Sequence, residues 1–183
     1  MTKQVLFVQG GGEDVHDRWD DKLVASLARE LGEGYAVRYP RMPDEADPQY
    51  SAWSGALLDE IGKLPAGSIL VGHSVGATIL LQLLARHTTQ QELGGIFLLA
   101  APFLGEGGWP SDDLEPIVDL TRLLPADVPV YLYHGDADET VPVNHLRLYA
   151  RSIPQAVVRT LAHRDHQFGN DLSEVAQDIR SLD

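Results

Sequence analysis

The sequence predicts an α/β fold, a three-layer sandwich in which helices cover both faces of a mostly parallel sheet of about six strands. Short apolar runs alternate along the chain with longer segments whose apolar residues repeat every three or four positions, the order expected of successive βα units. Several short runs are apolar throughout, as strands buried on both faces are. The chain has 183 residues, so we expect one domain over residues 1–183.

Six apolar runs, rich in branched or aromatic side chains, are interpreted as strands. In chain order they are Val5–Val8, Tyr35–Tyr39, Ile69–Val71, Ile96–Ala100, Val130–Tyr133 and Ala156–Leu161. The second run is the weakest. Right-handed crossovers between parallel strands would leave the C-terminal strand ends as the edge where a ligand binds.

Four segments have helical periodicity. Their apolar residues are Trp19, Leu23, Leu27 and Leu31; Tyr50, Trp53, Leu57 and Ile61; Ala77, Leu80, Leu81, Leu84 and Ala85; and Leu172, Val175, Ala176, Ile179 and Leu182. The region Phe103–Asp127 is rich in glycine and proline and is interpreted as a loop with one short helix around Leu114–Leu124. It either borders a pocket or is an ordinary surface connection.

Composition excludes several function classes. The net charge of −13 repels phosphate backbones, so we expect no nucleic-acid partner. The chain has no cysteine, which excludes disulfides, a thiol nucleophile and thiolate-bound zinc. The apolar run near Met1 is too short for a signal peptide or a membrane span. We therefore expect a cytoplasmic protein that does not enter the membrane.

The most informative segment is Gly72-His73-Ser74-Val75-Gly76, which has the pattern G-x-S-x-G. An apolar strand leads into it and an apolar helical stripe follows it. That strand–turn–helix context is what a nucleophile elbow needs, because the turn is tight and the serine at its apex is strained. Gly72 and Gly76 are expected to pack against each other. The alternative is a glycine-rich turn with a helix-capping serine.

The segment resembles the nucleophile elbow of the α/β-hydrolase superfamily, in which serine, acid and histidine follow in that order along the chain. His134-Gly135-Asp136-Ala137-Asp138, followed by Val141-Pro142, is similar to the superfamily's H-G-x-x-D-x-x-V-P segment. The resemblance implies that Asp138 is the acid, with Asp136 as its competitor.

The base is expected after the last strand. Asp165-His166-Gln167-Phe168 is similar to the D-H-x-F context of the superfamily's histidine, which implies that His166 is the base. His163 is the rival. A metal site built on His163 and His166 lacks a third ligand in the sequence, so we expect no metal.

Two backbone N–H groups are expected to stabilise an oxyanion, those of Val75 and Gly11. Where the superfamily usually has H-G-x after the first strand, this chain has Gln9-Gly10-Gly11, so the donor in this loop is less well defined. The same glycines match neither the G-x-G-x-x-G dinucleotide fingerprint nor a phosphate-binding P-loop. We expect no cofactor.

The resemblance implies a cap-free serine esterase, similar to small serine hydrolases of the retinoblastoma-binding type, acting on esters or thioesters of small-molecule acyl substrates. In those proteins a His/Trp cluster follows the first strand. Here we expect core packing for Trp19 and solvent exposure for His16. The alternative function is a weakly catalytic or non-catalytic protein-interaction module on the same fold.

Overall fold

The chain folds around one sheet of six strands in the order β2-β1-β3-β4-β5-β6, with every neighbouring pair parallel. The computed structural model describes residues 2–87, 91–114, 116–117, 120–125 and 127–182. The strands are β1 (Lys3–Val8), β2 (Tyr35–Arg38), β3 (Ser68–His73), β4 (Leu93–Leu99), β5 (Val130–Gly135) and β6 (Val157–Leu161). Each overlaps a predicted run, and the α/β sandwich is confirmed.

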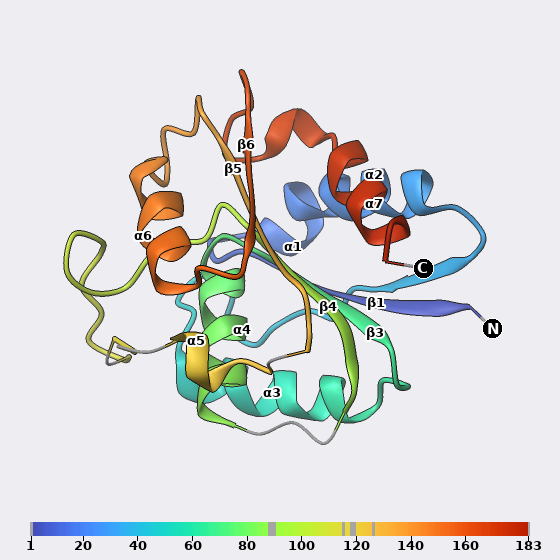
Figure 1. The fold of residues 1–183 in the computed structure, drawn as a ribbon, viewed down its shortest axis with the longest axis horizontal. Coiled ribbons are helices and arrows are strands. Elements are labelled where there is room, and N and C mark those ends of the chain that lie inside the picture. Colours follow the sequence, from blue (N-terminus) through green and yellow to red (C-terminus); the bar gives the residue numbers. More distant parts are fainter. Residues whose placement is uncertain (1, 88–90, 115, 118–119, 126, 183) are drawn as a thin grey trace.

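Helices cover both faces of the sheet (Figure 1). One face carries α3 (Tyr50–Gly62), α4 (Ser74–Arg86), α5 (Leu120–Leu123) and α6 (Asn144–Ser152), and the other carries α2 (Asp20–Leu31) and α7 (Ser173–Arg180). Successive side chains of a strand enter opposite cores, as Val5 and Leu6 do, because a strand alternates with a period of two. In the described part of the chain, no helix combines the length and apolar character needed to cross a membrane.

Helix α6 and the helix expected around Leu114–Leu124 differ from the prediction. Helix α6 was not predicted because it is short and buries only His145, Leu146 and Tyr149, too few apolar positions for a recognisable repeat. The helix expected around Leu114–Leu124 is limited to α5 in the described residues, and positions 115, 118 and 119 lie outside them.

The expectations for Trp19 and His16 are both wrong. Trp19 lies at the junction between α1 (Val15–Arg18) and α2, outside either helix. It is therefore not part of the apolar face that α2 packs against the sheet. It is 53% exposed, and the Lys22 ammonium lies 5.5 Å from its ring centroid. His16 is half-buried and stacks on Tyr39, with ring centroids 4.1 Å apart.

The strand order determines where along the sheet a ligand can bind. The chain runs from β1 outward to β2, then returns to β3 on the other side of β1 and continues outward from there. The loops after β1 and β3 therefore diverge at their C-terminal ends, and open α/β sheets bind ligands at such a switch point. The glycine loop and the G-x-S-x-G turn both lie there.

Candidate active site

Ser74 lies at the tight turn between β3 and α4. Its φ of 53° is in the left-handed region, which costs a serine about 1–3 kcal/mol and persists only where the surroundings enforce it. The flanking glycines allow this turn by close approach. A Cβ on Gly72 would lie 2.6 Å from the Ala77 Cα, and one on Gly76 would lie 1.9 Å from the Gln9 carbonyl oxygen. Gly72 thus packs against the start of α4, next to Gly76 in the chain, and Gly76 packs against the loop after β1.

The structure brings Ser74, His166 and Asp138 together from the loops after β3, β6 and β5. The His166 Nε2 lies 3.0 Å from the Ser74 Oγ, and the His166 Nδ1 lies 2.8 Å from an oxygen of Asp138. Because Asp138 can accept a hydrogen bond, Nδ1 carries the proton and Nε2 is left to accept the serine hydroxyl proton. The imidazole thus has the tautomer that a general base requires.

Asp138 is held as a carboxylate. One of its oxygens accepts the N–H groups of Thr140 and Val141, both at 2.8 Å. The other faces His166 and the His134 Nε2, which lies 3.3 Å away. Burial works to raise the pKa of Asp138, but hydrogen bonds from His134, His166 and Val141 outweigh it and hold the pKa well below its ordinary value. The carboxylate is therefore charged throughout the neutral pH range.

The two rivals from the sequence bind each other instead. An oxygen of Asp136 accepts the backbone N–H of His163 at 2.6 Å. The Asp136 N–H also donates to the Leu161 carbonyl at 3.0 Å. Both side chains are exposed. Asp136 therefore ties the loop after β5 to the loop after β6, which helps to hold Asp138 and His166 within reach of each other.

The glycine loop after β1 leaves one N–H available next to Ser74. The Gly10 N–H donates to Asp20 at 2.7 Å, and the Gly12 N–H donates to the Glu45 carbonyl at 2.6 Å. Within the described residues, no acceptor takes the Gly11 N–H. A Cβ on Gly11 would lie 2.8 Å from a methyl of Val75. The Val75 N–H lies in the first turn of α4, where backbone donors have no partner within the helix.

Gln9 supports this loop, a role that the sequence did not indicate. Its buried side chain accepts the Met42 N–H at 2.9 Å and donates to a carboxylate oxygen of Glu45 at 2.5 Å. These bonds join the glycine loop to the segment after β2. The departure from the H-G-x pattern was the available signal, but its partners are more than thirty positions away in sequence.

Residues 5–181 match the alpha/beta hydrolase family. The chain belongs to the alpha/beta hydrolase family. No curated protein matches it. The match covers nearly the whole chain, including the strands, the elbow and the loops that carry Asp138 and His166.

Several solved structures share the fold of this alpha/beta hydrolase. The ydeN gene product of B. subtilis is 20% identical, with a TM-score of 0.72 over 99% of this chain and 98% of that one. Est1E from Butyrivibrio proteoclasticus, solved with ferulic acid, is 15% identical, with a TM-score of 0.69 over 98% and 87%. A monoacylglycerol lipase from Paleococcus ferrophilus is 15% identical, with a TM-score of 0.65 over 100% and 96%.

A cavity of about 190 Å³ lies beside Val75 in this alpha/beta hydrolase. Its walls come from the first turns of α4, from the start of α3 and from the segment after β4. Apolar side chains predominate among them: Pro48, Val75, Ile79, Pro102, Leu104, Trp109, Pro110 and Leu114. Of the two interpretations of Phe103–Asp127, the structure thus supports the pocket border, and it is the first part of the region that lines this cavity.

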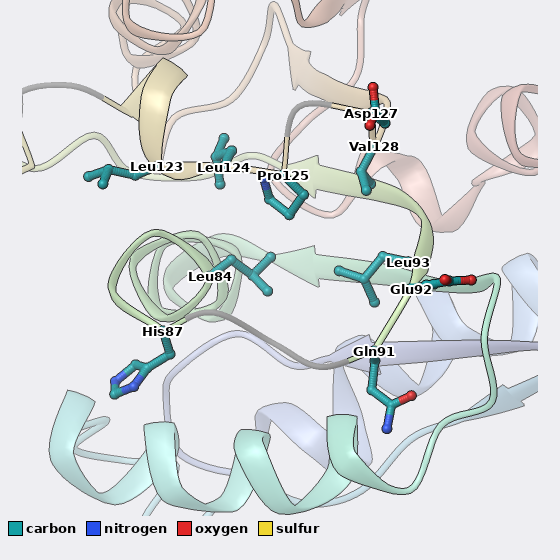
Figure 2. A pocket seen from close by; sticks show the side chains of 10 residues that line it. All are labelled: Leu84, His87, Gln91, Glu92, Leu93, Leu123, Leu124, Pro125, Asp127 and Val128. Atoms are coloured by element: carbon teal, nitrogen blue, oxygen red, sulfur yellow. The ribbon is translucent and has the colours of Figure 1, made fainter.

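A wider cavity of about 480 Å³ lies at the opposite edge of the sheet. It is formed by the last turn of α4, the start of β4 and the residues before β5, and Figure 2 shows Leu84 and Leu93 facing each other across it. Because α4 begins at Ser74 and ends at Arg86, this cavity is separated from Ser74 by the length of the helix. None of the residues that line it belongs to the site around Ser74.

Proposed function

We propose that this alpha/beta hydrolase is a serine esterase that cleaves carboxylic esters or thioesters of small acyl substrates. One observation carries the proposal: Ser74, His166 and Asp138 form a continuous hydrogen-bonded chain, with distances of 3.0 Å and 2.8 Å. Folding alone does not require a strained serine, a histidine of defined tautomer and a buried carboxylate to meet in this order.

The proposed reaction has two steps. In the first, His166 takes the proton of Ser74 as its oxygen attacks the acyl carbonyl, and then gives that proton to the leaving alcohol or thiol. In the second, His166 activates a water that releases the acyl group from Ser74. Asp138 orients the imidazole and stabilises its cation. The N–H groups of Gly11 and Val75 would stabilise the oxyanion, and loss of one such donor typically lowers the rate about 100- to 1000-fold.

The size of the cavity beside Val75 supports the proposal that the acyl group of the substrate is small. Val75, one of the two proposed oxyanion donors, lines it, so a substrate carbonyl held at that N–H would direct its acyl chain there. Its 190 Å³ is below the ~300 Å³ at which cavities for drug-sized ligands begin.

The alternative, a protein-interaction module on the same fold, would not need the hydrogen-bonded chain at Ser74. The finer resemblance to small serine hydrolases of the retinoblastoma-binding type remains a proposal from the sequence. A cytoplasmic location without a membrane partner also remains a proposal. The absence of a nucleic-acid partner is likewise a proposal, based on the charge of −13.

A fluorophosphonate probe tests the proposal, because it reacts with an activated serine. We expect the wild type to be labelled at Ser74, and Ser74→Ala to be unlabelled and to lose roughly 10⁴- to 10⁶-fold in ester hydrolysis. Ser54→Ala is the matched control, since Ser54 lies in α3 and its hydroxyl donates to the Ser51 carbonyl at 3.3 Å. It should be labelled like the wild type. A folded wild type that stays unlabelled would refute the esterase proposal and leave the interaction module.

A further inference from the structure

A second histidine and a second aspartate lie buried beneath the proposed site. His73 is the last residue of β3 and precedes Ser74, and Asp20 is the first residue of α2. Their side chains are 1% and 0% exposed. The His73 Nδ1 lies 3.0 Å from an oxygen of Asp20, and its Nε2 lies 3.0 Å from the backbone carbonyl oxygen of His166. Neither residue takes part in the reaction proposed above.

The partners of His73 determine its protons. A backbone carbonyl can only accept, so the Nε2 that faces His166 must carry a hydrogen. Asp20 receives the Gly10 N–H at 2.7 Å on the oxygen that faces His73, and the Gln167 amide at 3.3 Å on the other. A carboxyl group surrounded by donors is stabilised in its charged form. The Nδ1 then also donates, and His73 is a cation.

The other charges around His73 agree with this assignment. Burial works to lower its pKa, but Asp20, the His166 carbonyl and the charge of Asp138 outweigh burial and raise the pKa above its ordinary value. Burial works to raise the pKa of Asp20, but His73, Gly10 and Gln167 outweigh it and lower that pKa. The ring of His166 is a further titratable neighbour, and its centroid is 4.9 Å from that of His73.

We propose that His73 and Asp20 form a constitutive imidazolium–carboxylate pair that positions the catalytic machinery. The pair reaches three segments: His73 adjoins Ser74 in the chain, its Nε2–H holds the backbone of His166, and Asp20 holds Gly10 beside the donor Gly11. Both are positioning residues, since they act through these neighbours. The inference rests on the esterase proposal for its effect on rate, whereas the charge state of the pair can be measured independently.

The charge is essential because a neutral imidazole has only one N–H. If His73 lost its second proton, it could hold either Asp20 or the carbonyl of His166, but not both. In the tautomer that keeps the proton on Nδ1 and the bond to Asp20, the backbone of His166 would be free to move relative to Ser74. A displacement of about 1 Å at a reacting group can lower the rate about 100-fold.

The first experiment measures the protons directly. In protein labelled with ¹⁵N-histidine, we expect two ring N–H signals for His73 at a pH above 6.5, the ordinary value of the histidine pKa. The signals are assigned through contact with the Phe168 ring, whose centroid is 6.3 Å from that of His73. An unprotonated Nδ1 at this pH would overturn the ion pair whether or not the protein is an esterase.

The second experiment removes the charge of Asp20 and keeps its shape. In Asp20→Asn the new carbonyl can accept from Gly10 and His73. The new amide can donate to the Gln167 Oε1, a buried atom that has no partner at present among the described residues. We expect kcat to fall about 10- to 100-fold with little change in KM. We also expect a new loss of activity as pH rises and His73 deprotonates, a descending limb that the wild type lacks.

Asp178→Asn is the matched control. Asp178 is also a largely buried carboxylate, which accepts from Tyr133 and Arg159, but it lies on α7 away from Ser74. The Asp178→Asn variant should be less stable than the wild type and keep the wild-type dependence of activity on pH. A folded Asp20→Asn variant with the wild-type kcat and profile would overturn the positioning role. An unlabelled wild type would refute the esterase and this role together, and the ¹⁵N spectrum would still decide the ion pair.

Discussion

Asp138 and Asp136 lie two positions apart in the same turn, yet they have different surroundings. Asp138 accepts two backbone N–H groups and faces two histidines, whereas Asp136 is exposed and accepts the N–H of His163. The difference comes from the direction in which each side chain leaves the turn. It also separates a proposed catalytic role from a structural one.

Replacement of Asp138 by asparagine tests that separation. Asp138→Asn keeps the shape of the side chain but removes the charge that sets the His166 tautomer, so we expect kcat to fall about 10⁴-fold. Asp136→Asn keeps an oxygen for the His163 N–H, and we expect a change of less than about 10-fold. Steady-state hydrolysis of p-nitrophenyl esters measures both. Equal losses in the two variants would contradict the assignment of Asp138 as the acid.

Glycines show how the same residue differs between elements. Gly76 lies in the first turn of α4, which packs closely against the loop after β1, and there is no room for a Cβ between them. Gly55 lies in the middle of α3, and a Cβ there would meet nothing within 4 Å. Helix α4 is therefore held by close backbone approach, whereas α3 carries an avoidable glycine.

Alanine at these two positions should have opposite effects. We expect Gly76→Ala to lower the free energy of unfolding by about 3 kcal/mol, because its methyl would clash with the Gln9 carbonyl. Gly55→Ala should raise that free energy by about 0.5–1 kcal/mol, because alanine favours the helix over glycine. Urea unfolding measures both changes. A destabilised Gly55→Ala would show that α3 packs more closely there than the structure indicates.

At the scale of the whole molecule, the acidic residues act in two opposite ways. With a net charge of −13, the acidic side chains repel one another in the folded state. Partial protonation in acid relieves this repulsion and so favours folding. The pKa values of Asp20, Asp138 and Asp178 are lowered despite burial, because each carboxylate accepts hydrogen bonds from nearby donors. Protonation of these three groups therefore opposes folding.

We expect the buried carboxylates, rather than the relief of charge repulsion, to determine how the stability of the fold changes in acid. A group whose pKa is lower in the folded than in the unfolded state contributes stability above its unfolded pKa, which is 3.8 for aspartate. That stability is lost as pH falls through the folded pKa. The urea midpoint should therefore be similar at about pH 7 and pH 5 and fall steeply toward pH 3. A midpoint that rises toward pH 3 would mean that relief of charge repulsion is the larger effect.

Much of this fold could be predicted because its signals are local. A strand buried on both faces has a continuous apolar run, and an amphipathic helix has a 3.6-residue repeat, so both are visible within one short segment. The elbow at Ser74 is local as well, since strand, glycines and helix are adjacent in the chain. Helix α6 was missed because its apolar stripe is too short, and Trp19 was misplaced because a helix junction falls at that residue.

Local sequence patterns identified the α/β class, the six strands and the position of Ser74, and family resemblance favoured Asp138 and His166 over their rivals. The three-dimensional contacts were needed to show which acid and which histidine meet Ser74, and that His73 and Asp20 lie together beneath it. Ser74 and His166 are 92 positions apart, and His73 and Asp20 are 53 apart. Contacts at such separations depend on the order and crossovers of the strands, which no local pattern encodes.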